Sequence, residues 1–244
     1  MNHPLDGARL KVDRAQEHLD ALKIAIAKYV ESDPCMVIVE NDSAGNLAPR
    51  TEISYESDPG LRTIIGDCLS NSRSALDYIV WELASRYAGR ELVVPPFGTD
   101  KPYFPIYVVP NKCVGYINSL SQYNIPAGAL DEIRAVQPYF GGYQPLCFLH
   151  LLVNSDKHRL PVILRSTVSS VTVSVIHKKP SHTLDANPSL SPISNINDVE
   201  VNAHATAYVA SDDLLMPPEP IDRTLENISK CVADIIPRFD RFFT

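Results

Sequence analysis

Apolar residues recur three or four positions apart over four long stretches of the chain, which is the spacing of one helix face. These stretches are residues 5–32, 58–87, 145–160 and the segment that follows Pro220. A shorter stretch of the same kind covers residues 127–136. We therefore expect four main helices and one short helix, with the apolar faces packed together as the core of a helical bundle.

The stretch over residues 58–87 holds the longest helical pattern. Asp58 followed by Pro59 is a favourable helix start, and Gly89 is a suitable left-handed C-cap. A polar stripe accompanies the apolar one along this predicted helix, and its positions are Asp67, Ser70 or Asn71, Ser74, Asp77 or Tyr78, and Trp81. The regular order of this stripe predicts a face that meets other polar groups of the protein.

The segments between the predicted helices are of two kinds. Five prolines between residues 93 and 110 predict an extended loop. Four other segments are rich in β-branched residues or alternate between apolar and polar side chains, as β-strands do: residues 35–39, 50–56, 162–178 and 199–209. Because a polar, proline-containing loop joins the last two segments, we expect them to pair antiparallel.

Together these elements predict an α+β fold. Its core is a helical bundle of four main helices, and a mostly antiparallel β-sheet is formed by insertions between them. The sequence contains no internal repeat and no clear domain linker, so residues 1–244 are predicted to form a single α+β domain.

The charge and composition of the chain limit what it could bind. The net charge is −7, and residues 180–222 contain seven acidic residues but no lysine or arginine, so a general electrostatic surface for nucleic acid is not supported. No apolar run approaches the ~18 residues of a membrane span, and no signal-peptide core is present. Five scattered cysteines without a CxxC pair indicate reduced thiols and no zinc site. We therefore expect a cytoplasmic protein without a membrane partner.

The predicted helix over residues 145–160 becomes densely polar towards its end. Six polar residues fall within ten positions there: His150, Asn154, Asp156, Lys157, His158 and Arg159. His150, Asn154 and His158 lie four positions apart and therefore share one side of the helix. On the long helix, Arg73 and Asp77 are also four apart and can form an ion pair. Because buried polar groups need partners, we expect the two helices to pack directly and their polar stripes to meet.

Three interpretations of this polar region stay open. A metal site would combine His150 and His158 with Asp156 or Asp77. These two histidines are eight residues apart and therefore lie about 12 Å apart along the helix, too far to bind one ion unless the helix bends. We therefore predict neither a metal nor a cofactor. A satisfied polar core would result if these groups hydrogen-bond with the stripe of the long helix. General acid–base chemistry on a phosphodiester would use a histidine, with Lys157, Arg159 and Arg73 stabilising negative charge.

Several motifs resemble those of a family of uncharacterised bacterial proteins. They are GDCLSNSRSALDYIVWELA (residues 66–84), FPI (104–106), VQPY (136–139) and HLLVNSDKHR (150–159). This family brings no established activity.

A second resemblance concerns HEPN domains. The order of the helices and the spacing Asn154-x-x-x-His158 are distantly similar to these domains, many of which are metal-independent ribonucleases that act as dimers, while others bind without catalysis. The resemblance implies that Asn154 is the polar residue of the motif and His158 the catalytic histidine. Val153 stands at the position of the motif's arginine, so Arg159 or Arg73 would have to replace it.

The sequence therefore favours a cytoplasmic, HEPN-like helical protein that binds a nucleotide, RNA or partner protein through a polar site on two packed helices. The candidate binding residues are Arg73, Asp77, Trp81, His150, Asp156 and Lys157, and the candidate catalytic residues are His158, Asn154 and Arg159. The alternatives are a structural or interaction protein with a satisfied polar core, and a metal-independent ribonuclease. Whether the protein is an enzyme is left open, and the HEPN resemblance implies a homodimer.

Overall fold

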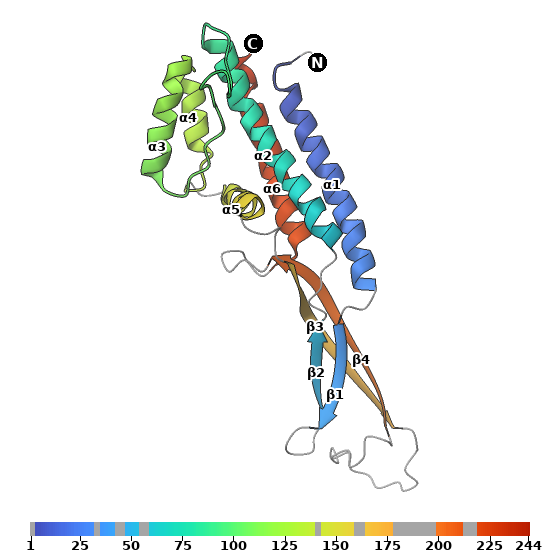
Figure 1. The fold of residues 1–244 in the computed structure, drawn as a ribbon. Coiled ribbons are helices and arrows are strands. Elements are labelled where there is room, and N and C mark those ends of the chain that lie inside the picture. The colour runs from blue at the N-terminus through green and yellow to red at the C-terminus, as the bar shows by residue number, and fades with distance from the viewer. Residues whose placement is uncertain are drawn as a thin grey trace. The chain divides into compact units, whose positions relative to one another are not determined.

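The structure is a computed structural model that describes residues 3–31, 35–41, 47–53, 59–139, 143–158, 164–177, 199–211 and 219–244. The chain divides into two compact units (Figure 1). The helical unit comprises residues 1–25, 59–163 and 211–244, and the strand unit comprises residues 26–58 and 164–210.

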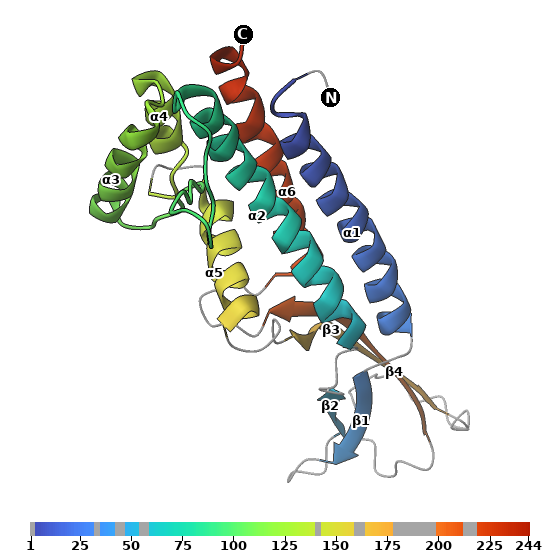
Figure 2. The same cartoon turned by 45° about the horizontal axis from the view of Figure 1, so that its top comes forward.

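Six α-helices and two 3-10 helices are present among the described residues. They are α1 (Asp6–Glu31), α2 (Pro59–Tyr87), α3 (Pro110–Ser119), η1 (Leu120–Tyr123), α4 (Ala127–Ala135), α5 (Gln144–His158), α6 (Ile221–Ile235) and η3 (Ile236–Phe242). Helices α1, α2 and α6 lie side by side in two views of the molecule (Figures 1 and 2). Helix α5 packs against both α2 and α6.

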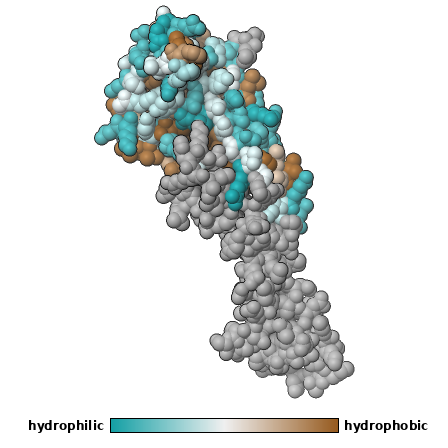
Figure 3. Space-filling model, in the orientation of Figure 1, coloured by the Kyte–Doolittle hydropathy of each residue, from teal (hydrophilic) through white to brown (hydrophobic). Residues whose placement is uncertain are grey.

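The core of the helical unit is formed by the apolar faces of these helices. Its largest fully buried side chains include Leu19, Leu22, Leu61, Ile65, Leu76, Ile79, Leu83, Phe104, Ile117 and Phe239. Burial of each such side chain contributes roughly 1.5–3 kcal/mol before the entropy of ordering is counted. In the view of Figure 3, by contrast, the described surface is mostly polar with separate apolar areas. None of the described helices combines the length and the apolar content that a bilayer crossing requires.

Most helix predictions are confirmed in position. The patterns over residues 5–32, 58–87 and 127–136 correspond to α1, α2 and α4, and the pattern over 145–160 corresponds to α5, which is described up to His158. Gly89 has φ +66°, the left-handed conformation expected after the end of α2. Helix α6 passes into the 3-10 helix η3 just before Pro237, a residue that cannot continue the α-helical hydrogen bonding.

The sequence patterns missed helix α3. Pro110 was assigned to the preceding loop, but in the structure it occupies the first turn of α3, where a proline's missing N–H costs nothing. Only Cys113 and Ile117 of this helix are buried. Two buried residues are too few to produce a clear helical periodicity.

The strand unit contains β1 (Cys35–Asn41), β2 (Leu47–Ile53), β3 (Leu164–His177) and β4 (Val199–Ser211). Strand β1 pairs antiparallel with β2, with Cys35 opposite Ile53. Strand β3 is hydrogen-bonded to β4 in a second, separate two-stranded sheet. The predicted strand segments 35–39 and 199–209 lie within β1 and β4, and the described parts of 50–56 and 162–178 lie within β2 and β3. The antiparallel direction of the β3–β4 pair stays a prediction.

The predicted α+β fold class is wrong. It expected a mostly antiparallel sheet formed by insertions between the helices, whereas the described part of the helical unit contains helices and no strand. The physical reason is that the helices bury their apolar faces against one another, so the core of the helical unit forms without a sheet. The prediction of a single domain over residues 1–244 stays a prediction.

Candidate functional site

Helices α2 and α5 pack directly against each other, as predicted. Burial lowers the pKa of His150 on α5, and the positive charge of Arg73 on α2 lowers this pKa further, so both effects favour the neutral imidazole. One turn along α5, Asn154 Nδ2 lies 3.0 Å from His150 Nε2. The polar residues of the two helices therefore come together around Arg73 and His150.

Arg73 and Asp77 form the ion pair that their spacing predicted. Arg73 Nε donates to Asp77 Oδ2 at 3.2 Å, and Arg73 Nη2 donates to Asp77 Oδ1 at 2.8 Å. The same pair binds the backbone of Phe104: Arg73 Nη2 donates to its carbonyl oxygen at 2.6 Å, and its N–H donates to Asp77 Oδ1 at 2.9 Å. The Arg73 side chain is only 15% exposed. The pair therefore fastens the segment around Phe104 to α2.

Gln137 fastens the next residues of the same segment and was not predicted as a site residue. Its buried amide donates from Nε2 to the carbonyl oxygens of Pro105 at 2.9 Å and Ile133 at 3.0 Å. The N–H of Tyr107 donates to Gln137 Oε1 at 3.1 Å. We call Arg73, Asp77 and Gln137 the backbone clamp. Phe104 and Pro105 belong to the sequence FPI (104–106) and Gln137 to VQPY (136–139), so the clamp connects these two sequences.

Tyr116 of α3 holds the clamped segment from a further side. Its hydroxyl accepts from the N–H of Tyr103 at 3.0 Å and donates to the carbonyl oxygen of Tyr103 at 3.1 Å. The ring centroids of Tyr103 and Tyr116 lie 4.2 Å apart, and the Arg73 guanidinium carbon lies 6.0 Å from the centroid of the Tyr103 ring. Burial, with a smaller contribution from the Tyr107 hydroxyl, raises the pKa of Tyr103 to about 12. No sequence pattern indicated this contact, because α3 was not predicted.

A groove of about 310 Å³ lies beside the clamp, on the surface of α2. We call it the α2 groove, and its lining residues are Ser74, Asp77, Tyr78, Trp81 and Pro102. Four of these residues belong to the polar stripe predicted along the long helix, and Pro102 belongs to the segment that the clamp holds. The polar stripe of α2 therefore lines the open α2 groove, and through Asp77 it also takes part in the backbone clamp.

The structure brings together only part of the predicted site. Asp77 and Trp81 line the α2 groove, while Arg73 lies in the clamp close to His150. The side chains of Asp156, Lys157 and His158, and the whole of Arg159, lie outside the described residues. The roles assigned to those four residues stay predictions.

The described residues offer neither a metal cluster nor a reactive thiol. No three His, Cys, Asp or Glu side chains in this part of the chain gather closely enough to hold a metal ion. Cys68, Cys113, Cys147 and Cys231 are free, and burial raises the pKa of each thiol. Because the thiolate is the nucleophilic form, these four cysteines are poorly suited to covalent chemistry.

Comparisons of the chain with protein-family models, with curated protein sequences and with solved structures give no match. Function is therefore inferred from the backbone clamp, the α2 groove and the residues around them.

Proposed function

We propose that this chain is a cytoplasmic interaction protein that binds a segment of a partner protein in the α2 groove. The observation that carries the proposal is the composition of the groove. Tyr78, Trp81 and Pro102 form most of its wall. Tyrosine and tryptophan supply large contact areas at a small cost in side-chain entropy, and they dominate the binding energy of many protein–protein contacts.

The charge of the groove favours a protein segment over a nucleotide or RNA. No basic side chain is among the described residues that line the groove, and its one carboxylate, Asp77, is bound to Arg73. A phosphate group would need a cation or a cradle of N–H groups. The net charge of −7 also repels a polyanion. An apolar or proline-containing peptide needs no charged partner in the groove.

The backbone clamp supports binding rather than catalysis. Arg73 and Asp77 bind each other and the backbone of Phe104, so neither is available as an acid, a base or an anion-stabilising group. This arrangement supports the alternative in which the polar cluster is a satisfied core. In that role the clamp holds the segment that carries Pro102, one wall of the α2 groove.

The HEPN resemblance remains part of the proposal in its non-catalytic form. Val153 stands where the catalytic motif has arginine, so the ribonuclease alternative needs Arg159 or Arg73 beside Asn154 and His158. The cytoplasmic setting is supported by Cys68, Cys113, Cys147 and Cys231, which are free, as is usual in a reducing compartment.

Trp81 provides a direct test, because it is the only tryptophan of the chain. We expect capped peptides rich in proline and leucine to shift its fluorescence as their concentration rises, while ATP and oligouridine leave it unchanged. Ser74→Arg fills the groove and should abolish the shift. The matched control is Ser85→Arg, the same change at an exposed position of α2 outside the groove, and it should preserve the shift.

Two outcomes would contradict the proposal. One is the absence of any fluorescence response to the peptides. The other is a response to oligouridine with cleavage in the presence of a chelator that is lost in His158→Ala, which would establish the ribonuclease alternative.

A further inference from the structure

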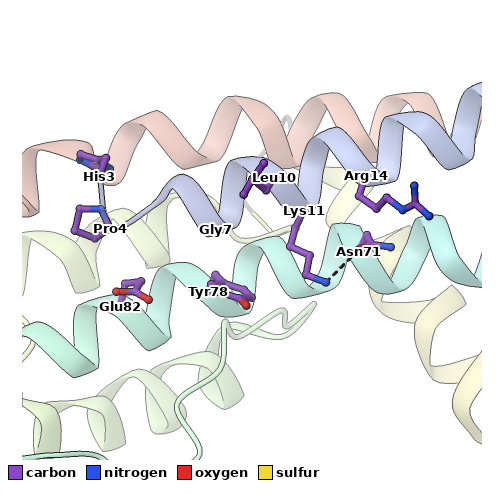
Figure 4. Close-up of a pocket in the computed structure, with 9 residues that line it drawn as sticks. All are labelled: His3, Pro4, Gly7, Leu10, Lys11, Arg14, Asn71, Tyr78 and Glu82. Atoms are coloured by element: carbon purple, nitrogen blue, oxygen red, sulfur yellow. Dashed lines mark hydrogen bonds between the residues drawn. The ribbon is translucent and has the colours of Figure 1, made fainter. Parts of the chain in front are cut away.

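A second, larger groove runs between α1 and α2. Its volume is about 720 Å³, and we call it the α1/α2 groove. Residues of both helices line it, among them Gly7 and Lys11 of α1 and Asn71, Tyr78 and Glu82 of α2. Figure 4 shows Glu82 towards one end, Gly7 and Tyr78 in the middle, and Lys11 with Asn71 towards the other end.

The two ends of this groove carry opposite charges that lack a counter-ion in the described part of the chain. Lys11 Nζ donates to the neutral side chain of Asn71 at 3.3 Å and forms no ion pair with a described residue. Arg14 also lines the groove, but its guanidinium is paired with Glu17. Glu82 has no hydrogen bond or ion pair with any residue that the structure describes, and burial raises the pKa of its carboxyl group. Because burial of an unpaired carboxylate is unfavourable, the end at Glu82 attracts a cation and the end at Lys11 an anion.

The length and width of the groove suit an extended polypeptide. Asn71 and Glu82 are eleven residues apart on α2, so the two charged ends lie about 16 Å apart along the helix axis. A volume of about 720 Å³ over this length gives a mean section of about 45 Å², less than that of an α-helix about 10–12 Å across. In an extended chain, residues four apart point to the same side and lie about 13 Å apart. Two long charged side chains at that spacing can reach both ends of the groove.

The middle of the groove is apolar. A Cβ atom on Gly7 would lie 3.0 Å from the Tyr78 ring, so glycine allows this ring to lie directly against α1. Leu10 also lines the groove, with 58% of its surface exposed. A bound chain therefore meets apolar surface between two opposite charges.

We propose that the α1/α2 groove binds an extended segment of a partner protein in which an acidic and a basic residue stand four positions apart. The acidic side chain pairs with Lys11, the basic side chain pairs with Glu82, and an apolar residue midway between them packs on Leu10 and Tyr78. This inference goes beyond the proposed function, because it assigns a second site that selects by charge and does not include Trp81.

Capped pentapeptides that carry a fluorophore test the proposal by fluorescence anisotropy with the full chain. Glu-Ser-Val-Ser-Lys has the required pattern, and its matched controls are the diacidic Glu-Ser-Val-Ser-Glu, the dibasic Lys-Ser-Val-Ser-Lys and the neutral Gln-Ser-Val-Ser-Gln. The wild type should bind the mixed peptide at least about fivefold more tightly than each control. The net charge of −7 would favour the dibasic peptide instead, so it cannot produce this preference.

Charge reversal should change the preference in a defined way. Lys11→Glu makes both ends negative and should bind the dibasic peptide most tightly. Glu82→Lys makes both ends positive and should bind the diacidic peptide most tightly, in spite of the negative net charge of the chain. The milder variants Lys11→Gln and Glu82→Gln should each weaken binding of the mixed peptide, which keeps the test valid if a reversal fails to fold.

Matched controls separate these effects from a change in net charge. Lys112→Glu on α3 and Glu91→Lys in the loop after α2 make the same charge changes at exposed positions outside the groove, and each should keep the wild-type preference. Circular dichroism reports whether each variant is folded. Equal affinity of the wild type for the four peptides would overturn the proposal. So would the absence of binding to the mixed peptide up to about 500 μM protein, or an order of affinities that the folded reversal variants leave unchanged.

Discussion

Arg73 donates to Asp77 and to the carbonyl oxygen of Phe104, while Asp77 accepts from Arg73 and from the N–H of Phe104. Removing either side chain leaves polar groups of the other, and of the backbone, without these partners. The cost of such orphaned groups exceeds the net gain of an exposed ion pair, because water does not fully replace the lost bonds. Arg73 and Asp77 therefore contribute to the free energy of unfolding.

Arg73→Ala should lower the free energy of unfolding by roughly 1–3 kcal/mol, the usual cost of leaving partly buried polar groups unsatisfied. The matched control is Arg14→Ala, which removes an arginine whose partner, Glu17, is also exposed. This control should cost less than about 1 kcal/mol. Urea denaturation monitored by circular dichroism measures both values. Equal losses in the two variants would mean that the clamp adds nothing to an ordinary surface ion pair.

At this scale the sequence predicted side-chain pairs that lie on one helix and missed those that span the fold. The four-residue spacing predicted the ion pair of Arg73 with Asp77 and placed His150 and Asn154 on one side of their helix. The backbone partner of Arg73 lies 31 positions away, and the amide of Gln137 reaches Pro105 over 32 positions. No local period connects such residues, so only the folded chain identifies them.

At the scale of elements, the loop after α2 is more ordered than its five prolines suggest. Arg90 donates to both carboxylate oxygens of Asp100 at 2.7 Å, and Asp100 Oδ2 also accepts from the N–H of Val93 at 2.9 Å. The N–H of Asp100 donates in return to the carbonyl oxygen of Val93 at 3.1 Å. Asp100 is only 5% exposed. One aspartate therefore closes the loop, a role that sequence alone does not distinguish from that of any loop aspartate.

Asp100→Asn should loosen this loop while leaving the helices intact. The hydrogen bonds from Arg90 and from the N–H of Val93 hold the pKa of Asp100 well below its usual range. Its charged form therefore stabilises the fold above the ordinary pKa of aspartate, and that contribution falls as the pH drops below it. Hydrogen exchange should show faster exchange at the Val93 and Asp100 amides in the variant. Asp131→Asn, at an exposed ion pair in α4, should leave both amides unchanged. Slow exchange in Asp100→Asn would show that other contacts close the loop.

At the scale of the whole molecule, the helical pattern was a better guide than the strand pattern. The helices that form the core were predicted because each contributes a wide apolar face, as the buried residues of α2 and α6 show. The strands were also predicted locally, but period-two alternation says nothing about what covers the apolar side. Combining these strands with the helices in one α+β fold produced the wrong fold class.

The division into two units leads to a last prediction. Fully buried large side chains such as Leu76, Ile79 and Phe239 give the helical unit an apolar core of its own, so this unit should fold by itself. Replacing residues 164–210 with a short glycine–serine linker should preserve the helical circular dichroism signal and a cooperative melt within about 5 °C of the wild type. Removing residues 110–123 instead should lower the melting temperature further, because that deletion removes buried Ile117 and the contact from Tyr116 to Tyr103. Loss of cooperative melting in the first variant would show that the strand unit is required for the helical core to fold.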